Sequence, residues 1–117
     1  MDDYLAALRR EFEADEGSFL LKLRVYADWD REAFTRLIGV MERCASELES
    51  RDAIERWIAN GFWFVEGFAT DWVGHTNRIP TGEEDYYRAA CTRLSDLAWW
   101  LFFGECPYEG GGPLPLM

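Results

Sequence analysis

The segment from Trp57 to Val73, WIANGFWFVEGFATDWV, concentrates more large apolar side chains than any other part of this 117-residue chain. Apolar or small residues recur here at steps of three and four, the spacing of one helical face: Ile54, Ile58, Gly61, Val65, Phe68 and Trp72. Other large side chains point in further directions, and a helix that is apolar nearly all round is usually enclosed by other helices. The segment therefore predicts the central helix of a bundle, with Phe68 in the core.

The rest of the chain predicts an all-α, single-domain bundle of about four to five helices around this central aromatic-rich helix. A chain of this length can bury roughly two thirds of its unfolded surface in one core, and 49% of its residues are hydrophobic. Residues 1–104 are predicted to form the domain. Residues 105–117, ECPYEGGGPLPLM, are rich in glycine and proline and predict an extended, partly disordered tail.

Capping residues indicate where the helices begin. Asp2 or Asp3 can start the first helix, and Asp28 or Asp30 can start a long one. The spacings Asp52 to Glu55 and Thr81 to Glu84 match a capping box and predict the starts of the central and last helices. Two glycines inside the central helix, Gly61 and Gly67, weaken it, so we expect both to face closely packed neighbouring helices.

Residues 18–27, SFLLKLRVYA, allow two interpretations. Leu21, Leu23 and Val25 alternate with basic residues as in a strand, whereas Phe19, Leu20, Leu23 and Tyr26 fit helical spacing. A lone strand would find no partner elsewhere in the chain, and unpaired backbone groups are costly. Helix is therefore preferred, and strand remains the alternative.

The charge restricts the class of partner. Twelve basic residues against 22 acidic ones give a formal net charge of −10, which repels nucleic-acid phosphates and anionic lipid heads and attracts basic proteins. We expect neither a nucleic-acid nor a membrane partner. Glu66 and Asp71 also interrupt the richest apolar window, which is too short for a transmembrane helix.

Cysteines and the single histidine point away from catalysis. Cys44, Cys91 and Cys106 are odd in number and follow no secretory signal, which predicts reduced thiols in a cytoplasmic protein. His75 lies four residues after Asp71, a spacing that a metal pair or a base with its orienting carboxylate could use. Further ligands are lacking nearby, so a helix-end histidine held by a carboxylate is preferred. We predict no catalytic residue, cofactor or metal.

Aromatic residues are unusually frequent, with eight Phe, six Trp and five Tyr. All of them could serve the core. The alternative is a contact surface, because aromatic side chains dominate binding hot spots, and its members would be Trp63, Trp72, Trp99, Trp100 and Tyr108.

Two segments, GFWFVEGFATDWVGHTNRI and YYRAACTRLSDLAWWLFFGECPY, carry a resemblance to a known class of proteins. An aromatic helix ending W-x-x-H, a Tyr-Tyr pair, a Leu/Trp-rich helix and G-E-x-P-Y together resemble small helical immunity proteins of bacterial polymorphic-toxin and contact-dependent inhibition systems. The resemblance covers about residues 52–108. It implies a protein without enzymatic activity that binds and neutralises a cognate toxin domain, often across the toxin's active site.

The resemblance supplies no toxin-contacting positions, so the predicted partner-binding residues are physical inferences. They are acids and polar or aromatic groups near the aromatic end of the molecule: Trp63, Glu66, Asp71, His75, Asn77, Glu105, Tyr108 and Glu109. The tail is expected to reach outward towards a basic partner, for example a nuclease or another basic toxin. Two alternatives stay open: a small enzyme or ligand-binding domain with a pocket near Glu66, Asp71 and His75, and a structural subunit that forms a homo-oligomer.

Overall fold

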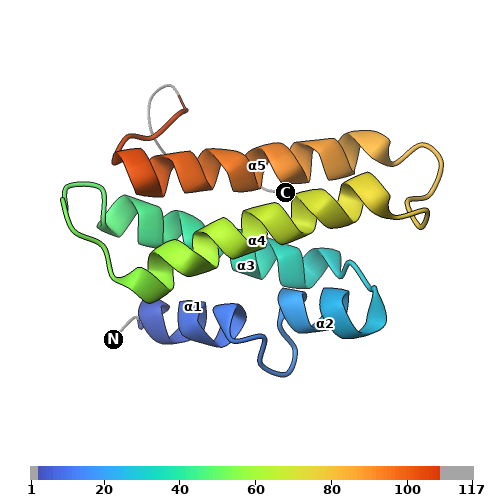
Figure 1. The fold of residues 1–117 in the computed structure, drawn as a ribbon, viewed down its shortest axis with the longest axis horizontal. Helices are drawn as coiled ribbons and strands as arrows, with labels where there is room; N and C mark the ends of the chain where they lie inside the picture. The colour runs from blue at the N-terminus through green and yellow to red at the C-terminus, as the bar shows by residue number, and fades with distance from the viewer. Residues whose placement is uncertain (1–2, 109–117) are drawn as a thin grey trace.

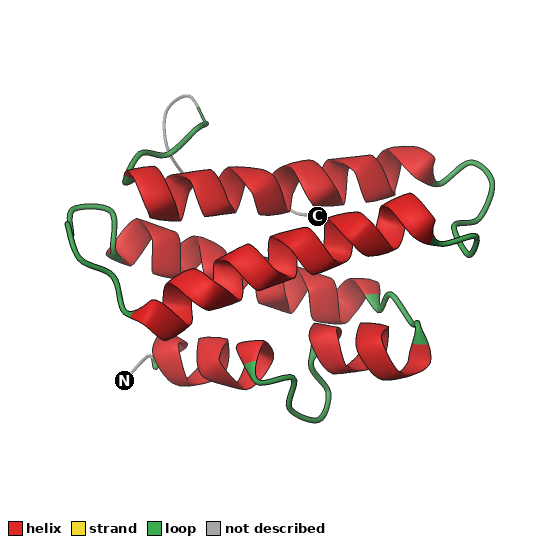
Figure 2. Ribbon diagram, in the orientation of Figure 1, coloured by secondary structure: helices red, strands yellow, loops and turns green. Residues whose placement is uncertain are grey.

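Five helices follow one another along residues 3–108, the part of the chain that this computed structural model describes. They are α1 (Tyr4–Phe12), α2 (Phe19–Tyr26), α3 (Arg31–Glu47), α4 (Arg56–His75) and α5 (Glu84–Phe103). Figure 2 shows only helices and loops over this range. The predicted all-α bundle is therefore confirmed.

Of the three long helices, α3 lies at the centre of the bundle. In Figure 1, α4 crosses in front of α3, with α5 along one side and the short helices α1 and α2 along the other. All five helices contribute to one core, whose largest fully buried side chains include Leu8, Phe19, Phe34, Leu37, Met41, Ile58, Phe62, Leu94 and Leu97. The closest backbone packing centres on α3, which approaches α1, α2 and α5, whereas α4 approaches α5 most closely, so the aromatic-rich helix is not the centre that the sequence predicted.

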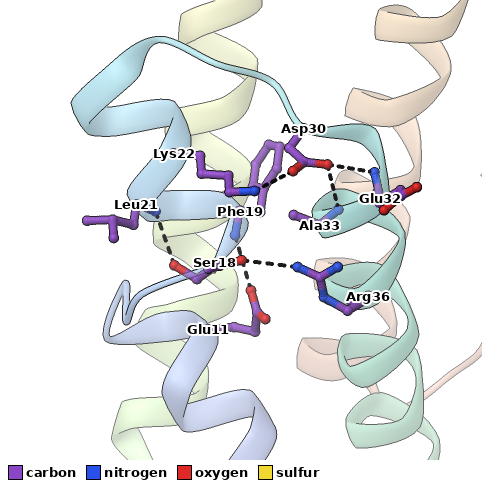
Figure 3. Close-up of polar contacts among 10 residues, drawn as sticks. Glu11, Ser18, Phe19, Leu21, Lys22, Asp30, Glu32, Ala33 and Arg36 are labelled. Carbon is purple, nitrogen blue, oxygen red and sulfur yellow. Dashed lines mark hydrogen bonds and ion pairs between the residues drawn. The ribbon is translucent and has the colours of Figure 1, made fainter.

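Residues 18–27 form a helix, so the preferred interpretation is confirmed. The Ser18 hydroxyl accepts the Leu21 N–H at 3.2 Å, and α2 then buries Phe19, Leu20 and Leu23. Lys22 binds the Asp30 carboxylate, which also accepts the N–H groups that open α3 (Figure 3). The helical spacing outweighs the strand-like alternation because a helix satisfies its backbone hydrogen bonds internally.

The capping predictions were right for the first helices and wrong for the last two. Asp3 caps α1, accepting the Ala6 N–H at 3.1 Å, and Asp30 caps α3. The capping boxes at Asp52 and Thr81 do not form: α4 begins at Arg56 and α5 at Glu84, without a side-chain cap. Their glutamates have other partners. Glu55 binds Arg51 at 2.6 Å, and Glu84 accepts the Gly82 N–H at 2.9 Å.

The buried face of α4 is rotated from the predicted one. Ile58 and Val65 are buried as expected, but the other buried positions are Phe62 and Ala69. Phe68, predicted to lie in the core, is only partly buried and stacks on Phe64 with ring centroids 5.5 Å apart. The reason is that α4 packs against α5 on one flank and against the short helices on the other. Its buried stripe therefore lies between these two flanks, and Phe68 falls outside it.

The two glycines of α4 differ in their surroundings. A Cβ atom at Gly61 would meet the Phe12 ring of α1 at 2.0 Å, which confirms the predicted close approach of a neighbouring helix. A Cβ at Gly67 would meet nothing within 4 Å, so the same prediction was wrong for Gly67. Gly67 faces open space on the exposed side of α4.

Candidate functional site

Helices α4 and α5 lie side by side and antiparallel, and their seam organises the candidate site (Figure 1). The Thr70 side chain lies close to Cys91 across this seam, which places the two positions at the same level. Moving seven residues back along α4 and seven forward along α5 keeps the same helical faces. Trp63 therefore lies near the level of Ala98 and Trp99, two turns from the Thr70–Cys91 pair.

The exposed charged residues of this helix pair lie towards the ends of the helices, at Arg56, Asp71, Glu84, Asp85 and Arg88, and none lies between or beyond them on the shared seam side. On α5 every exposed residue after Arg88 is uncharged: Ala89, Thr92, Ser95, Trp99, Phe102 and Phe103. On α4 the exposed residues between Arg56 and Asp71 are also uncharged: Asn60, Trp63, Phe64, Gly67 and Thr70. We call the surface made by Trp63, Gly67, Thr70, Ser95, Trp99, Phe102 and Phe103 the α4–α5 face.

Large aromatic side chains lie open to solvent at one end of the α4–α5 face. The exposed fractions are 70% for Trp63, 46% for Trp99, 47% for Phe102 and 64% for Phe103. The Trp99 and Phe103 rings stack with centroids 4.0 Å apart, so each holds the other in place without covering it. Small side chains at Gly67, Thr70 and Ser95 continue the surface towards the other end.

This surface contrasts with the rest of the molecule. The exposed positions of α3 are mostly charged, for example Arg31, Glu32, Arg36, Arg43 and Glu47. Depletion of charge around exposed aromatic residues is the compositional signature of the centre of a protein–protein interface. On a protein of net charge −10, an uncharged aromatic face of this kind is the feature that most clearly indicates a contact surface.

The seam beneath the α4–α5 face holds a thiol and a carboxylate. Burial raises the pKa of Cys91, the Thr70 hydrogen bond opposes this shift, and the nearby Glu66 carboxylate adds to it. Burial likewise raises the pKa of Cys44 to about 12. Both groups are therefore neutral thiols near pH 7, and the thiolate needed for nucleophilic attack is not favoured at either position.

Asp71 and His75 lie at the exposed carboxyl end of α4. His75 Nδ1 is 2.9 Å from the Asp71 carbonyl oxygen and 3.3 Å from Asp71 Oδ1. With Phe68, Trp72 and Thr76 they line a shallow hollow of about 340 Å³. Among residues 3–108, no group of three or more His, Cys, Asp and Glu side chains is arranged to hold a metal ion. The shorter contact of His75 is with the Asp71 backbone carbonyl, and the Asp71 carboxylate lies beside the ring at the end of the helix.

Tyr108 does not extend freely from the chain end, contrary to the expectation for the tail. Its hydroxyl donates to Asp96 Oδ2 at 2.6 Å, and the buried Arg93 guanidinium lies 5.6 Å from its ring centroid. Burial and the Asp96 carboxylate raise the pKa of the Tyr108 hydroxyl. These contacts hold residues 105–108 back against α5, because Arg93 and Tyr108 cover each other.

The predicted partner-binding residues do not form one cluster. Trp63 and Glu66 border the seam with α5, whereas Asp71 and His75 lie at the end of α4, beside Phe68. The remaining members are scattered: Asn77 is exposed in the loop after α4, Glu105 is exposed after α5, Tyr108 contacts α5, and Glu109 lies outside the described residues.

Sequence reasoning missed Phe102 and Phe103 as surface residues and included Trp99 only in its alternative aromatic surface. That surface also contained Trp100, which is 3% exposed and belongs to the core, and Trp72, which is partly buried. A signal was present. The steps Tyr87, Ala90, Leu94, Leu97 and Leu101 define the buried stripe of α5, and positions 99, 102 and 103 fall outside it.

Comparisons with known protein families, with curated proteins and with solved structures found no match to this chain. Within residues 3–108, none of the helices combines the length and the apolar character needed to cross a bilayer.

Proposed function

We propose that this protein is a non-enzymatic immunity protein that binds and neutralises a cognate bacterial toxin domain through the α4–α5 face. The observation that carries the proposal is the uncharged, aromatic α4–α5 face on a protein of net charge −10. The resemblance of residues 52–108 to small helical immunity proteins supplies the class of partner. The protein acts in the cytoplasm, where its three free cysteines stay reduced.

The aromatic side chains are the binding anchors in this proposal. Trp63, Trp99 and Phe102 are large and exposed, and each would bury much of its surface in a pocket of the partner. Gly67 and Thr70 leave space beside them for a partner segment to approach the α4 backbone. The toxin surface is expected to be apolar at its centre.

Acidic residues around the α4–α5 face indicate the charge of the partner. Glu66 borders the seam and Glu105 is exposed beyond the end of α5, so a partner with a basic rim would meet opposite charge. Charged groups at a rim mainly accelerate association and contribute less to the lifetime of the complex. A nuclease domain, which binds phosphates through basic groups, has the required charge.

The test is binding kinetics against purified candidate toxin domains, beginning with any that is encoded next to this gene, with growth protection as a second readout. Trp63→Ala and Phe102→Ala should each speed dissociation by about tenfold or more, as expected for hot-spot residues. Charge reversal at Glu66 and Glu105 should slow association and reduce its dependence on salt. The same variants should also give weaker protection to cells that express the toxin.

Tyr26 of α2 provides the matched control, because it is also aromatic and 70% exposed but lies away from the α4–α5 face. Tyr26→Ala should leave both rates unchanged. Unchanged rates for Trp63→Ala and Phe102→Ala, together with a loss of binding for Tyr26→Ala, would refute the assignment of the α4–α5 face as the binding surface. Sedimentation of the protein alone tests the alternative of self-association: a dimer that Trp63→Ala dissociates would support a structural subunit instead.

A further inference from the structure

A second hollow, of about 350 Å³, lies on the other flank of α4, where α1 and α2 pack against it. Its floor is apolar and comes from all three helices: Phe12 of α1, Leu20 of α2, and Phe64 and Val65 of α4. The Gly61 backbone forms part of the wall, where the Phe12 ring approaches it. This volume lies within the range of small-molecule sites, about 300–1,000 Å³.

Among the residues that line this hollow, one is a cation and one is an anion, and a second cation, Arg24, lies further out, 6.0 Å from the Phe64 ring centroid. The Arg9 guanidinium lies 4.2 Å above the Trp57 ring, which holds it at the edge of the apolar floor. Glu13 is one turn further along α1, with its Oε1 3.7 Å from Arg9 Nη1. That distance is too long for a hydrogen bond, and about half of each side chain is exposed, 52% and 58%. Both groups can therefore still bind a ligand.

Charge selects among the possible ligands. A simple carboxylate would suit Arg9 but would be repelled by Glu13 and by the net charge of −10. A simple amine would suit Glu13 but would be repelled by Arg9. A zwitterion presents a carboxylate and an ammonium group a short distance apart, carries no net charge, and matches both rim groups at once.

We infer that this hollow binds a free α-amino acid with a large apolar side chain. Its carboxylate accepts hydrogen bonds from Arg9, its ammonium group donates to Glu13, and its side chain packs on Phe12, Leu20 and Phe64. The Asn60 carboxamide, at the mouth of the hollow, offers a further polar contact. The inference is independent of the proposed function, because the hollow and the α4–α5 face use different flanks of α4.

The test is a titration of the full chain with L-phenylalanine, 3-phenylpropionate and 2-phenylethylamine, which share a phenyl ring but differ in their charged groups. Binding is followed through the NMR signal of the Trp57 indole N–H, assigned with the Trp57→Phe variant. L-Phenylalanine should shift this signal to saturation, and the two single-charge compounds should bind about tenfold more weakly or worse. Equal affinity for the three compounds, or an unresponsive Trp57 signal, would overturn the inference.

Variants of the rim assign the two contacts separately. Arg9→Gln should remove the advantage of L-phenylalanine over 2-phenylethylamine, and Glu13→Gln should remove its advantage over 3-phenylpropionate. Arg10→Gln is the matched control, because Arg10 is the adjacent exposed arginine and lines a different hollow with Asp15 and Arg36. Its affinity for L-phenylalanine should equal that of the unaltered protein. A loss as large as that of Arg9→Gln would show that overall charge, and not this site, controls binding.

Discussion

The ring of Phe12 lies directly against the backbone of Gly61, so that a Cβ atom at position 61 would be 2.0 Å from Phe12 Cδ2. Trp57 and Phe62 flank Phe12 edge-on, with ring centroids 6.4 and 5.8 Å distant, so the ring could yield only towards the hollow that it lines. This contact joins α1 to α4. Glycine is therefore required at position 61 by the packing of a neighbouring helix.

The first prediction compares the two glycines of α4. Gly61→Ala should lower the free energy of unfolding by about 1–3 kcal/mol through overpacking against Phe12. Gly67→Ala should raise it by up to about 1 kcal/mol, because a Cβ there meets nothing within 4 Å and alanine favours helix. Urea unfolding measures both. Equal effects of the two substitutions would contradict the Phe12 contact.

The second prediction concerns the burial of two phenylalanines. Phe34 is fully buried, with the Phe19 ring 5.1 Å away, so Phe34→Ala should cost about 3–5 kcal/mol. Phe68 is only partly buried, so Phe68→Ala should cost about 1–2 kcal/mol. Chemical denaturation of both variants provides the comparison. A loss for Phe68→Ala as large as that for Phe34→Ala would restore the register predicted from the sequence.

The third prediction concerns the carboxyl end of α2. Ala27 adopts a left-handed conformation, with φ 52° and ψ 35°, which alanine adopts at a cost and glycine adopts freely. Ala27→Gly should therefore raise the free energy of unfolding by about 0.5–1 kcal/mol. Ala89→Gly, at an exposed position inside α5, should lower it by about 1 kcal/mol. Destabilisation by both substitutions would be inconsistent with the left-handed conformation at Ala27.

The fourth prediction follows from Asp30. Its pKa lies below the usual range, chiefly because Lys22 binds the carboxylate and also because the Ala33 N–H does. A lowered folded-state pKa contributes stability that is present above the unfolded pKa, about 3.9, and is lost as the pH falls through the folded pKa. Asp30→Asn keeps a good helix cap but loses the Lys22 pair, so its stability should decline less in acid. Unfolding curves from about pH 3 to about pH 7 test this.

Glu11 supplies the control with the opposite sign. Burial raises the pKa of its carboxyl group, although the Phe19 N–H, which binds the carboxylate (Figure 3), and the charge of Arg36 act against the shift. Its stabilising contribution is therefore present below the unfolded pKa and is lost as the pH rises through the raised folded pKa. Glu11→Gln should remove this loss at higher pH.

An identical acid response of Asp30→Asn and the unaltered protein would show that the Lys22 pair contributes nothing.

The sequence alone determined the helical elements, because their signals are local. Three- and four-residue spacing identified all five helices, including α2, where it competed with a strand-like alternation. Asp30 caps α3 as predicted, because it lies directly before the first helical residue and accepts N–H groups of the first turn. Asp52 was not, because the cap position depends on how the connecting loop approaches α4, and Glu55 instead binds Arg51. Sequence spacing does not encode that approach.

Only the tertiary structure decided which aromatic side chains are exposed. On α4, Phe62 is buried and its neighbour Trp63 is open to solvent. On α5, Trp100 is buried and its neighbour Trp99 is open to solvent. Both pairs lie in uniformly apolar segments. A helix that is apolar on nearly every side can bury any of several stripes, and the stripe is chosen by the helices that pack beside it. The α4–α5 face exists because no helix among residues 3–108 covers that side of α4 and α5.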